Sequence, residues 1–181
     1  FSGDRILCFS YNKRDKKLED HDIAAHVKPG SGPRHLVFSP NGRYAYLMNE
    51  LSGKVIVYSY SDGKLKELQS IAADNANARG GADIHVSPDG MFVYTSTRLK
   101  GDGITIFRVG NKGTLTRVGA QLTGKHPRNF AITPNGNFLL VACRDDNSIQ
   151  VYSRDKDTGL LKNTHQDIVL SHPVCVKFYP E

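Results

Sequence analysis

Arginine and carboxylate side chains recur at matched positions in this sequence. Arg34 is followed by Glu50, and Arg128 is followed at the same interval by Arg144. Arginine binds carboxylate or phosphate groups through two parallel hydrogen bonds. A carboxylate among guanidinium groups stays ionised, because nearby positive charge lowers its pKa, and it can then position or deprotonate water. The pattern therefore predicts a site for an anionic small molecule.

Three segments of the chain agree at their apolar positions and differ at polar ones, and these differences define the candidate site. Shared positions are expected to carry the fold, whereas differing positions are free to carry chemistry. The candidate residues are Arg34, His35, Glu50, Asp83, Arg98, Arg128 and Arg144. The alternative interpretation is that these side chains form ion pairs between neighbouring structural units.

Two further residues extend this set. Residues 72–81 form a long connection rich in small polar side chains, and we expect a lid or substrate loop with Arg79 at its tip. His85 lies in the middle of a strand pattern, where a buried histidine bonded to Asp83 is favoured over a catalytic one. The histidines on connections lack the spacing of metal ligands; they are His26, His126 and His172.

The candidate residues sit within a repeat. Residues 33–50 (PRHLVFSPNGRYAYLMNE), 81–98 (GADIHVSPDGMFVYTSTR) and 127–144 (PRNFAITPNGNFLLVACR) align without gaps. A proline at the same point of each repeat recurs at intervals of about 46 to 48 residues, which is typical of β-propeller blades. These prolines are Pro40, Pro88, Pro134 and Pro180.

Each repeat is expected to form four antiparallel strands, which in the first repeat cover residues 35–39, 44–49, 55–60 and 65–71. Pro40 presets φ at the first turn position, and Asn41-Gly42 accepts positive φ. The apolar residues are mostly β-branched or aromatic and show no helical period. The predicted fold class is therefore all-β, a β-propeller of four-stranded antiparallel blades with about four blades present.

The chain is interpreted as one partial propeller domain over residues 1–181. The expected blades cover residues 1–28 (the end of one blade), 29–76, 77–124, 125–170 and 171–181 (the start of the next). The chain starts in the middle of a blade and does not begin with Met, so we expect a part of a longer ring. Its open blade faces are expected to pair with the remaining blades or to self-associate.

The strand order predicts where the candidate residues meet. The first strand of a blade runs into the hairpin and the second runs back, so the start of the first and the end of the second lie at the same rim. Arg34 and Glu50 occupy these two positions in one blade. We therefore expect the candidate residues of three blades to converge at one opening.

Composition narrows the possible partners. The net charge is +6, but the basic residues are scattered, so no nucleic acid is expected. No apolar run reaches about 18 residues, so no membrane span is expected. Cys8, Cys143 and Cys175 lack a pairing motif, which indicates reduced thiols and favours the cytoplasm. No metal site is expected, because the histidines lack the spacing of metal ligands.

Longer strings of the sequence resemble one family. GPRHLVFSPNGRYAYLMNE, RGGADIHVSPDGMFVYTSTR and HPRNFAITPNGNFLLVACRDDNSIQVY are similar to the bacterial 6-phosphogluconolactonases of the seven-bladed propeller type. Fungal carboxymuconate-lactonising cyclases belong to the same superfamily. The resemblance covers essentially the whole chain and implies that its blades are part of a seven-bladed ring.

The resemblance also implies roles for individual residues. Arg34, Glu50 and Arg98 match positions proposed for the site of the cyclase branch, whose further histidine would lie before Phe1. The implied reaction is cofactor-free hydrolysis of a phosphorylated sugar lactone. Glu50 would activate water, while Arg34 and Arg98 would stabilise the oxyanion or hold the anion. The expected substrate-binding residues are His35, Arg79, Asp83, His85, Arg128 and Arg144.

Two alternative functions remain open at the level of the sequence. Propellers often act as non-catalytic binding platforms, and such a protein would use the same rim to hold a partner. A related cyclase acting on a muconate-type dicarboxylate would use the same arginines. Arginine pockets accept phosphate and carboxylate alike, so residue types alone do not separate these substrates.

Overall fold

The computed structural model describes residues 3–179 of the chain, apart from the side chains of residues 20 and 21. Within these residues the only helical element is the short 3-10 turn η1 (Arg144–Asp146). The all-β class predicted from the sequence is confirmed. The strands are β1 (Arg5–Asn12), β2 (Lys17–His26), β3 (Pro33–Phe38), β4 (Tyr44–Asn49), β5 (Lys54–Ser61), β6 (Lys64–Ala72), β7 (Gly81–Val86), β8 (Phe92–Thr97), β9 (Gly103–Val109), β10 (Leu115–Leu122), β11 (Pro127–Ile132), β12 (Phe138–Cys143), β13 (Ser148–Arg154), β14 (Leu161–Asn163) and β15 (Ile168–Val169).

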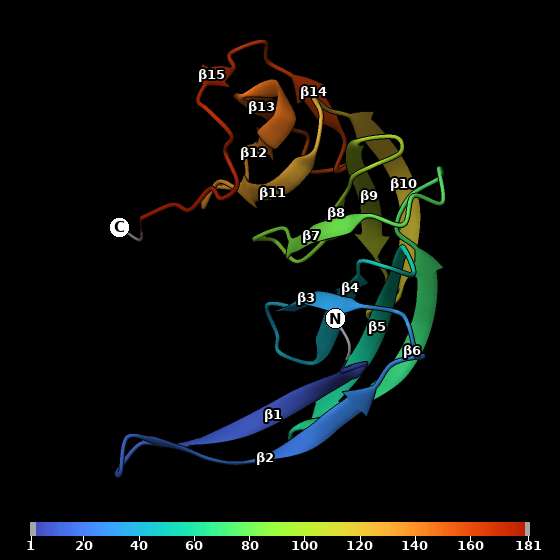
Figure 1. The fold of residues 1–181 in the computed structure, drawn as a ribbon, viewed down its shortest axis with the longest axis vertical. Helices are drawn as coiled ribbons and strands as arrows, with labels where there is room; N and C mark the ends of the chain where they lie inside the picture. The colour runs from blue at the N-terminus through green and yellow to red at the C-terminus, as the bar shows by residue number, and fades with distance from the viewer. Residues whose placement is uncertain (1–2, 180–181) are drawn as a thin grey trace.

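These strands form antiparallel sheets that follow one another around an open arc (Figure 1). A two-stranded sheet, β1–β2, comes first. The sheets β3-β4-β5-β6 and β7-β8-β9-β10 follow, and then β11-β12-β13-β14, with β15 also paired to β13. Strands β3, β7 and β11 lie on the inner side of the arc (Figure 1). This arrangement confirms the predicted four-stranded blades.

The recurring turn is held by its own polar side chains. Ser39 Oγ donates to Asn41 Oδ1 at 2.7 Å and accepts from the amide of Tyr44 at 3.0 Å. Gly42 follows with φ of 69°, a conformation that is easy only for glycine. The same bonds form around Ser87 and around Thr133. The SPNG-type motif therefore closes each β-hairpin by local chemistry.

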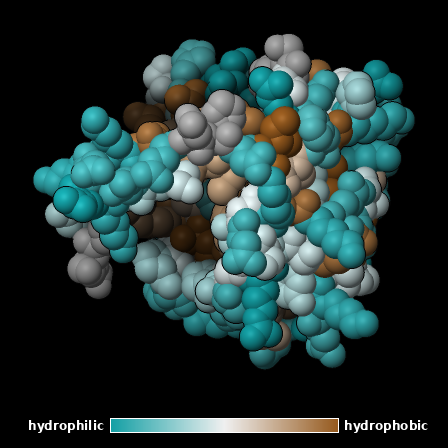
Figure 2. All heavy atoms as spheres, turned by 90° about the horizontal axis from the view of Figure 1, so that it is seen from below, coloured by the Kyte–Doolittle hydropathy of each residue, from teal (hydrophilic) through white to brown (hydrophobic). Residues whose placement is uncertain are grey.

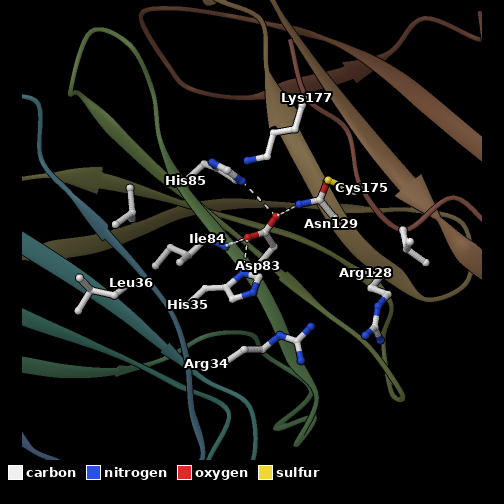
Figure 3. Close-up of a pocket in the computed structure, with 12 residues that line it drawn as sticks. Arg34, His35, Leu36, Asp83, Ile84, His85, Arg128, Asn129, Cys175 and Lys177 are labelled. Atoms are coloured by element: carbon white, nitrogen blue, oxygen red, sulfur yellow. Dashed lines mark hydrogen bonds and ion pairs between the residues drawn. The ribbon is translucent and has the colours of Figure 1, made fainter. Parts of the chain in front are cut away.

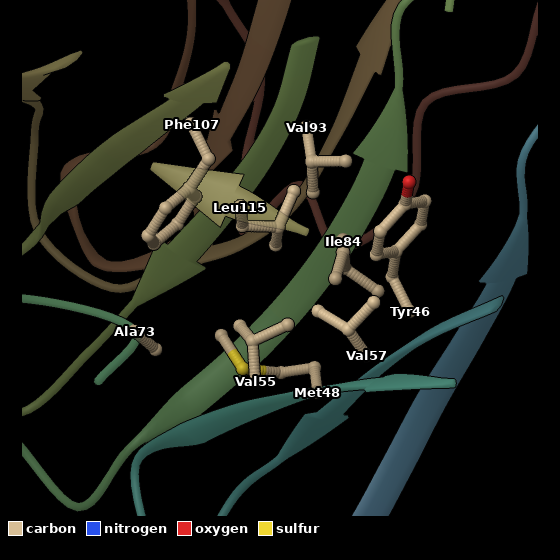
Figure 4. Packing of buried hydrophobic residues seen from close by; sticks show 9 residues of the cluster. All are labelled: Tyr46, Met48, Val55, Val57, Ala73, Ile84, Val93, Phe107 and Leu115. Atoms are coloured by element: carbon tan, nitrogen blue, oxygen red, sulfur yellow. The ribbon is translucent and has the colours of Figure 1, made fainter. Parts of the chain in front are cut away.

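Neighbouring sheets are joined by clusters of buried apolar side chains, one of which is drawn in Figure 4. Tyr46 and Met48 of β4 pack with Val93 of β8 and Phe107 of β9, and all four are fully buried. Each such side chain contributes about 1.5 to 3 kcal/mol when it leaves water. Because most of this core lies between blades, each blade depends on its neighbours for stability.

A buried arginine adds a polar connection between the last two four-stranded sheets. Arg154 on β13 donates to Tyr94 Oη at 2.8 Å and to the carbonyl of Gly136 at 3.1 Å. Its third contact is with Asp89 Oδ2 at 2.7 Å. The side chain of Arg154 is fully buried, so these partners offset the cost of removing its charge from water.

The last described segment covers residues expected to start a new blade. Residues 173–179 are not paired with any described strand. The amide of Val176 instead donates to Asn129 Oδ1 at 2.7 Å. Cys175 is a free, exposed thiol in this segment. Pro180 lies outside the described residues, and the blade boundaries stay a prediction.

The β1–β2 end of the arc exposes apolar side chains. Seen from this side, brown apolar residues lie among teal hydrophilic ones (Figure 2). The exposed fractions are 36% for Leu7, 49% for Phe9 and 69% for Leu18, which is high for large apolar residues on one sheet. Self-association through such faces stays a prediction. No helix among the described residues is long and apolar enough to cross a membrane.

Replacing Phe107 with alanine should destabilise the fold, because it empties space between two blades. We expect the free energy of unfolding to fall by about 3 to 5 kcal/mol. The matched control is Phe138→Ala, since Phe138 is 40% exposed on β12. Urea denaturation followed by circular dichroism measures both. Equal losses for the two variants would contradict the role of the inter-blade core.

Candidate active site

The inner strands of three blades line a cavity of about 580 Å³ on the concave side of the arc (Figure 3). Charged and polar residues come from the starts of β3, β7 and β11, and others come from the last segment. The lining residues are Arg34, His35, Leu36, Val37, Asp83, Ile84, His85, Arg128, Asn129, Val174, Cys175 and Lys177.

A backbone irregularity at the start of each inner strand sets the direction of these side chains. The pairing register shifts between Pro33 and His35 in β3, and equivalent shifts occur early in β7 and β11. Successive side chains of a regular strand point to opposite faces, whereas a bulge re-aims one of them. Arg34 and His35 can therefore both line the cavity although they are adjacent in sequence.

Asp83 lies at the centre of the cavity wall, with only 4% of its side chain exposed. Its Oδ1 accepts a hydrogen bond from His35 Nδ1 at 2.7 Å, and its Oδ2 accepts one from His85 Nε2 at 3.1 Å. The side-chain amide of Asn129 and the backbone amide of Phe130 also donate to Oδ2. One carboxylate thus connects β3, β7 and β11.

The protonation state of Asp83 follows from these contacts. Burial alone would raise the pKa of this carboxyl, but the hydrogen bonds from His35 and His85 outweigh it. The charge of His85 and the amide of Phe130 act in the same direction. The pKa of Asp83 therefore lies well below its usual range, and the group remains a carboxylate at neutral pH.

A second cluster joins Glu50 to two arginines. Glu50 Oε2 lies 2.6 Å from Arg34 Nη1, and its Oε1 lies 2.8 Å from Arg98 Nη2. Arg34 Nε also donates to the carbonyl of Ala82 at 2.8 Å. The structure thus brings together Arg34, Glu50 and Arg98, three of the seven residues expected at one rim. Glu50 and Arg98 do not line the cavity themselves and contact it through Arg34.

His126 extends this cluster, although the sequence indicated only a connection there. Arg98 Nη1 lies 3.2 Å from His126 Nε2, and His126 Nδ1 lies 3.3 Å from Asp145 Oδ2. Burial, together with the positive charges of Arg144 and Arg98, lowers the pKa of His126. A neutral ring that accepts from Arg98 and donates to Asp145 satisfies all these contacts. The only sequence signal was its place directly before Pro127-Arg128.

Arg128 has a different environment from Arg34 and Arg98. Its side chain projects from β11 and lines the cavity (Figure 3), and no described residue forms a hydrogen bond or ion pair with it. Lys177 lines the same cavity and likewise has no partner among residues 3–179. Two positive charges are therefore available to an anion in this cavity.

Two candidate residues lie elsewhere. Arg79 lines a separate cavity of about 670 Å³, together with Lys28 and Lys54. Arg144 is on the surface, where its Nε donates to Asp145 Oδ1 at 2.6 Å. Arg79 and Arg144 therefore do not join the residues that line the central cavity, and no hydrogen bond or ion pair joins either side chain to Glu50. His85, expected to be buried, is 29% exposed but does bond to Asp83.

The described residues also constrain what else the site could hold. Among residues 3–179, no group of three or more histidine, cysteine, aspartate or glutamate side chains is arranged to hold a metal ion. His35 and His85 share Asp83 as a hydrogen-bond acceptor. These side chains form a hydrogen-bonded cluster that can orient a ring nitrogen toward the cavity.

Comparison with known proteins identifies the family to which the chain belongs. The chain matches the model of the family "Lactonase, 7-bladed beta-propeller" over residues 2–178, and it belongs to that family. The resemblance identified in the sequence is confirmed, including the seven-bladed type of ring.

Two of the similar proteins carry the same name, 6-phosphogluconolactonase. The 6-phosphogluconolactonase of Formosa agariphila is 48% identical over 82% of this chain and 43% of its own length. That of Bacillus subtilis is 35% identical over 94% of this chain and 50% of its own length. The chain thus spans about half the length of these relatives.

Solved structures agree with this placement. A protein of Bacteroides uniformis, provisionally assigned as a 6-phosphogluconolactonase, is 57% identical and superimposes with a TM-score of 0.95 over 99% of this chain and 52% of its own. The periplasmic gluconolactonase PpgL of Pseudomonas aeruginosa is 32% identical, with a TM-score of 0.87 over 98% of this chain and 51% of its own.

Replacing Asp83 with asparagine should destabilise the protein at neutral pH, because it removes a buried hydrogen-bonded charge. We expect a loss of about 2 to 4 kcal/mol in the free energy of unfolding at pH 7. The pKa of Asp83 is lower in the folded protein than in the unfolded chain, where it is about 3.9. The Asp83 carboxylate therefore stabilises the fold above that pH, and this stabilisation is lost as the pH falls below it. The difference in the free energy of unfolding between the wild type and Asp83→Asn should therefore shrink from pH 4 to pH 2.

Urea denaturation across this pH range measures the effect. The matched control is Asp157→Asn, because Asp157 is exposed on a turn. A constant difference between the wild type and Asp83→Asn below pH 4 would contradict a carboxylate that remains ionised in the fold.

Proposed function

We propose that this chain supplies the substrate cavity of an enzyme that hydrolyses 6-phosphogluconolactone to 6-phosphogluconate. The main support is Arg128, a half-buried guanidinium that faces the cavity without a counter-ion among the described residues. Such a charge is costly to desolvate unless an anion binds it. The names of the relatives make a phosphorylated sugar lactone the preferred anion.

The proposed reaction needs no cofactor, because a lactone is already an activated ester. Water attacks the carbonyl carbon, the carbonyl oxygen becomes an oxyanion, and the bond to the ring oxygen then breaks. The ring oxygen takes up a proton and the product leaves as a carboxylate. Arg34, whose Nη2 is not used by Glu50 or Ala82, is the proposed donor to the oxyanion.

Glu50 and Arg98 support this role from behind the cavity. Each carboxylate oxygen of Glu50 already accepts from an arginine. This geometry favours Glu50 as the group that positions Arg34 and Arg98. Its assignment as the water-activating base stays a prediction. Arg128 and Lys177, which line the same cavity and have no partner among the described residues, are the proposed partners of the phosphate.

The proposed compartment is the cytoplasm. Cys8, Cys143 and Cys175 form no disulfide. Unpaired thiols are usual in reducing compartments. Neither a nucleic acid nor a membrane partner is proposed.

Replacing Arg128 with glutamine should weaken binding of the phosphorylated lactone most, because it removes a charge-assisted contact to phosphate. We expect KM for 6-phosphogluconolactone to rise about 10-fold to 100-fold, with a smaller effect on unphosphorylated gluconolactone. Initial rates on both lactones, and on a muconate-type lactone, measure the preference. Turnover of the muconate-type lactone alone would favour the cyclase, and turnover of none would favour a binding platform.

Replacing Glu50 with glutamine should slow lactone opening by about 100-fold while the fold survives, because Arg34 and Arg98 lose the carboxylate that holds them. The matched control is Glu19→Gln, since Glu19 is exposed on β2. Initial-rate assays and thermal unfolding are compared for both variants. An unchanged rate for Glu50→Gln would remove Glu50 from the site.

A further inference from the structure

His35 has the contacts of a general base. Its Nδ1 lies 2.7 Å from Asp83 Oδ1, the shorter of the two contacts between a histidine and this carboxylate. Its other ring nitrogen, Nε2, has no hydrogen-bond partner among the described residues. With 43% of its side chain exposed, His35 lines the cavity and is accessible to water.

The ionised state of Asp83 determines which nitrogen of His35 carries the proton. A carboxylate only accepts hydrogen bonds, so Nδ1 must be the donor in the neutral ring. The lone pair then resides on Nε2. A carboxylate that orients an imidazole in this way also stabilises the imidazolium formed when the ring takes a proton.

The other candidates for this role are less suitably placed. Both oxygens of Glu50 are bound to arginines, and Glu50 does not line the cavity. His85 Nε2 lies 3.1 Å from Asp83, and its ring packs edge-on against Phe130 at a centroid distance of 4.8 Å. Only 29% of the His85 side chain is exposed.

We propose that His35, oriented by Asp83, is the base that deprotonates the hydrolytic water. The inference rests on the proposed lactone hydrolysis and names the residue that drives it. The ring of His35 lies between Asp83 and the guanidinium of Arg34 (Figure 3). A water molecule bound to Nε2 of His35 would therefore lie next to Arg34, the proposed donor to the oxyanion.

The proton balance of the step is complete. Nε2 of His35 takes one proton from water as the oxygen forms a bond to the lactone carbonyl carbon. When the tetrahedral intermediate collapses, the bond from this carbon to the ring oxygen breaks. The imidazolium returns its proton to that oxygen, which becomes the product hydroxyl. His35 is neutral again, and the remaining acid proton leaves to solvent.

The cavity also contains the groups that would influence this proton transfer. They are Arg34 on β3, Asp83 and His85 on β7, Arg128 on β11, and Cys175 and Lys177 in the last segment. A general base acts only in its unprotonated form, so we expect the rate to fall at acidic pH. Histidines titrate between about pH 5 and pH 8.

The first experiment compares the wild type with His35→Asn and His35→Ala on 6-phosphogluconolactone from pH 5 to pH 8. We expect kcat to fall about 100-fold to 10,000-fold, with a much smaller change in KM, and the acidic limb of the pH profile to disappear. Added imidazole should restore part of the rate to His35→Ala. His165→Asn, at an exposed turn, is the matched control and should keep the wild-type profile.

The variant His85→Asn distinguishes the roles of the two histidines that share Asp83. It should retain the acidic limb and should not respond to imidazole. If His35→Asn retains both the wild-type kcat and the acidic limb of the pH profile, His35 is not the base, although the proposed lactone hydrolysis stands. If the unchanged protein turns over no lactone, the proposed function itself fails, and the role of His35 fails with it.

A second measurement does not depend on turnover. Ring ¹⁵N chemical shifts of histidine-labelled protein report which nitrogen is protonated. At the neutral plateau of the titration we expect His35 to carry its proton on Nδ1, with Nε2 unprotonated. The opposite tautomer would overturn the proposed orientation by Asp83 whether or not the protein is active.

Discussion

The buried carboxylate of Asp83 is the interaction on which the inner wall of this arc depends. Its two oxygens accept hydrogen bonds from His35 on β3 and from Asn129 and Phe130 on β11, while Asp83 itself lies on β7. An isolated buried charge would be prohibitively costly, so these donors must remain in place. The spacing of the three strands and the orientation of the histidines thus have one common cause.

The arginine side chains around this carboxylate are of two kinds. Arg34 and Arg98 share the carboxylate of Glu50 and donate to backbone carbonyls, which fixes their positions. Arg128 faces the cavity without such a partner. The first kind provides directed hydrogen bonds at low cost, whereas the second provides net attraction for an anion. A site that binds a charged lactone and stabilises its oxyanion needs both.

The propeller architecture explains how one repeated unit can carry different chemistry in each blade. The turn around Ser39 and the buried core recur, because every blade must close its hairpin and pack on its neighbours. The starts of β3, β7 and β11 are not constrained in this way and carry different residues. The irregular pairing at each start directs these residues toward the centre, so sequence differences at equivalent positions become one composite cavity.

The elements of the fold follow from patterns in the sequence, because turn chemistry and strand alternation act between residues close along the chain. The hairpin at Asn41-Gly42, the four-stranded blade and the meeting of Arg34 with Glu50 all followed from spacing within one repeat. Which charged side chains remain unpaired is visible in the tertiary structure alone. It placed Arg79 and Arg144 outside the central cavity, brought His126 to Arg98, and made Asp83 a shared acceptor. These contacts join residues from different blades, and their geometry depends on how the blades twist and pack against one another, which local sequence patterns do not encode.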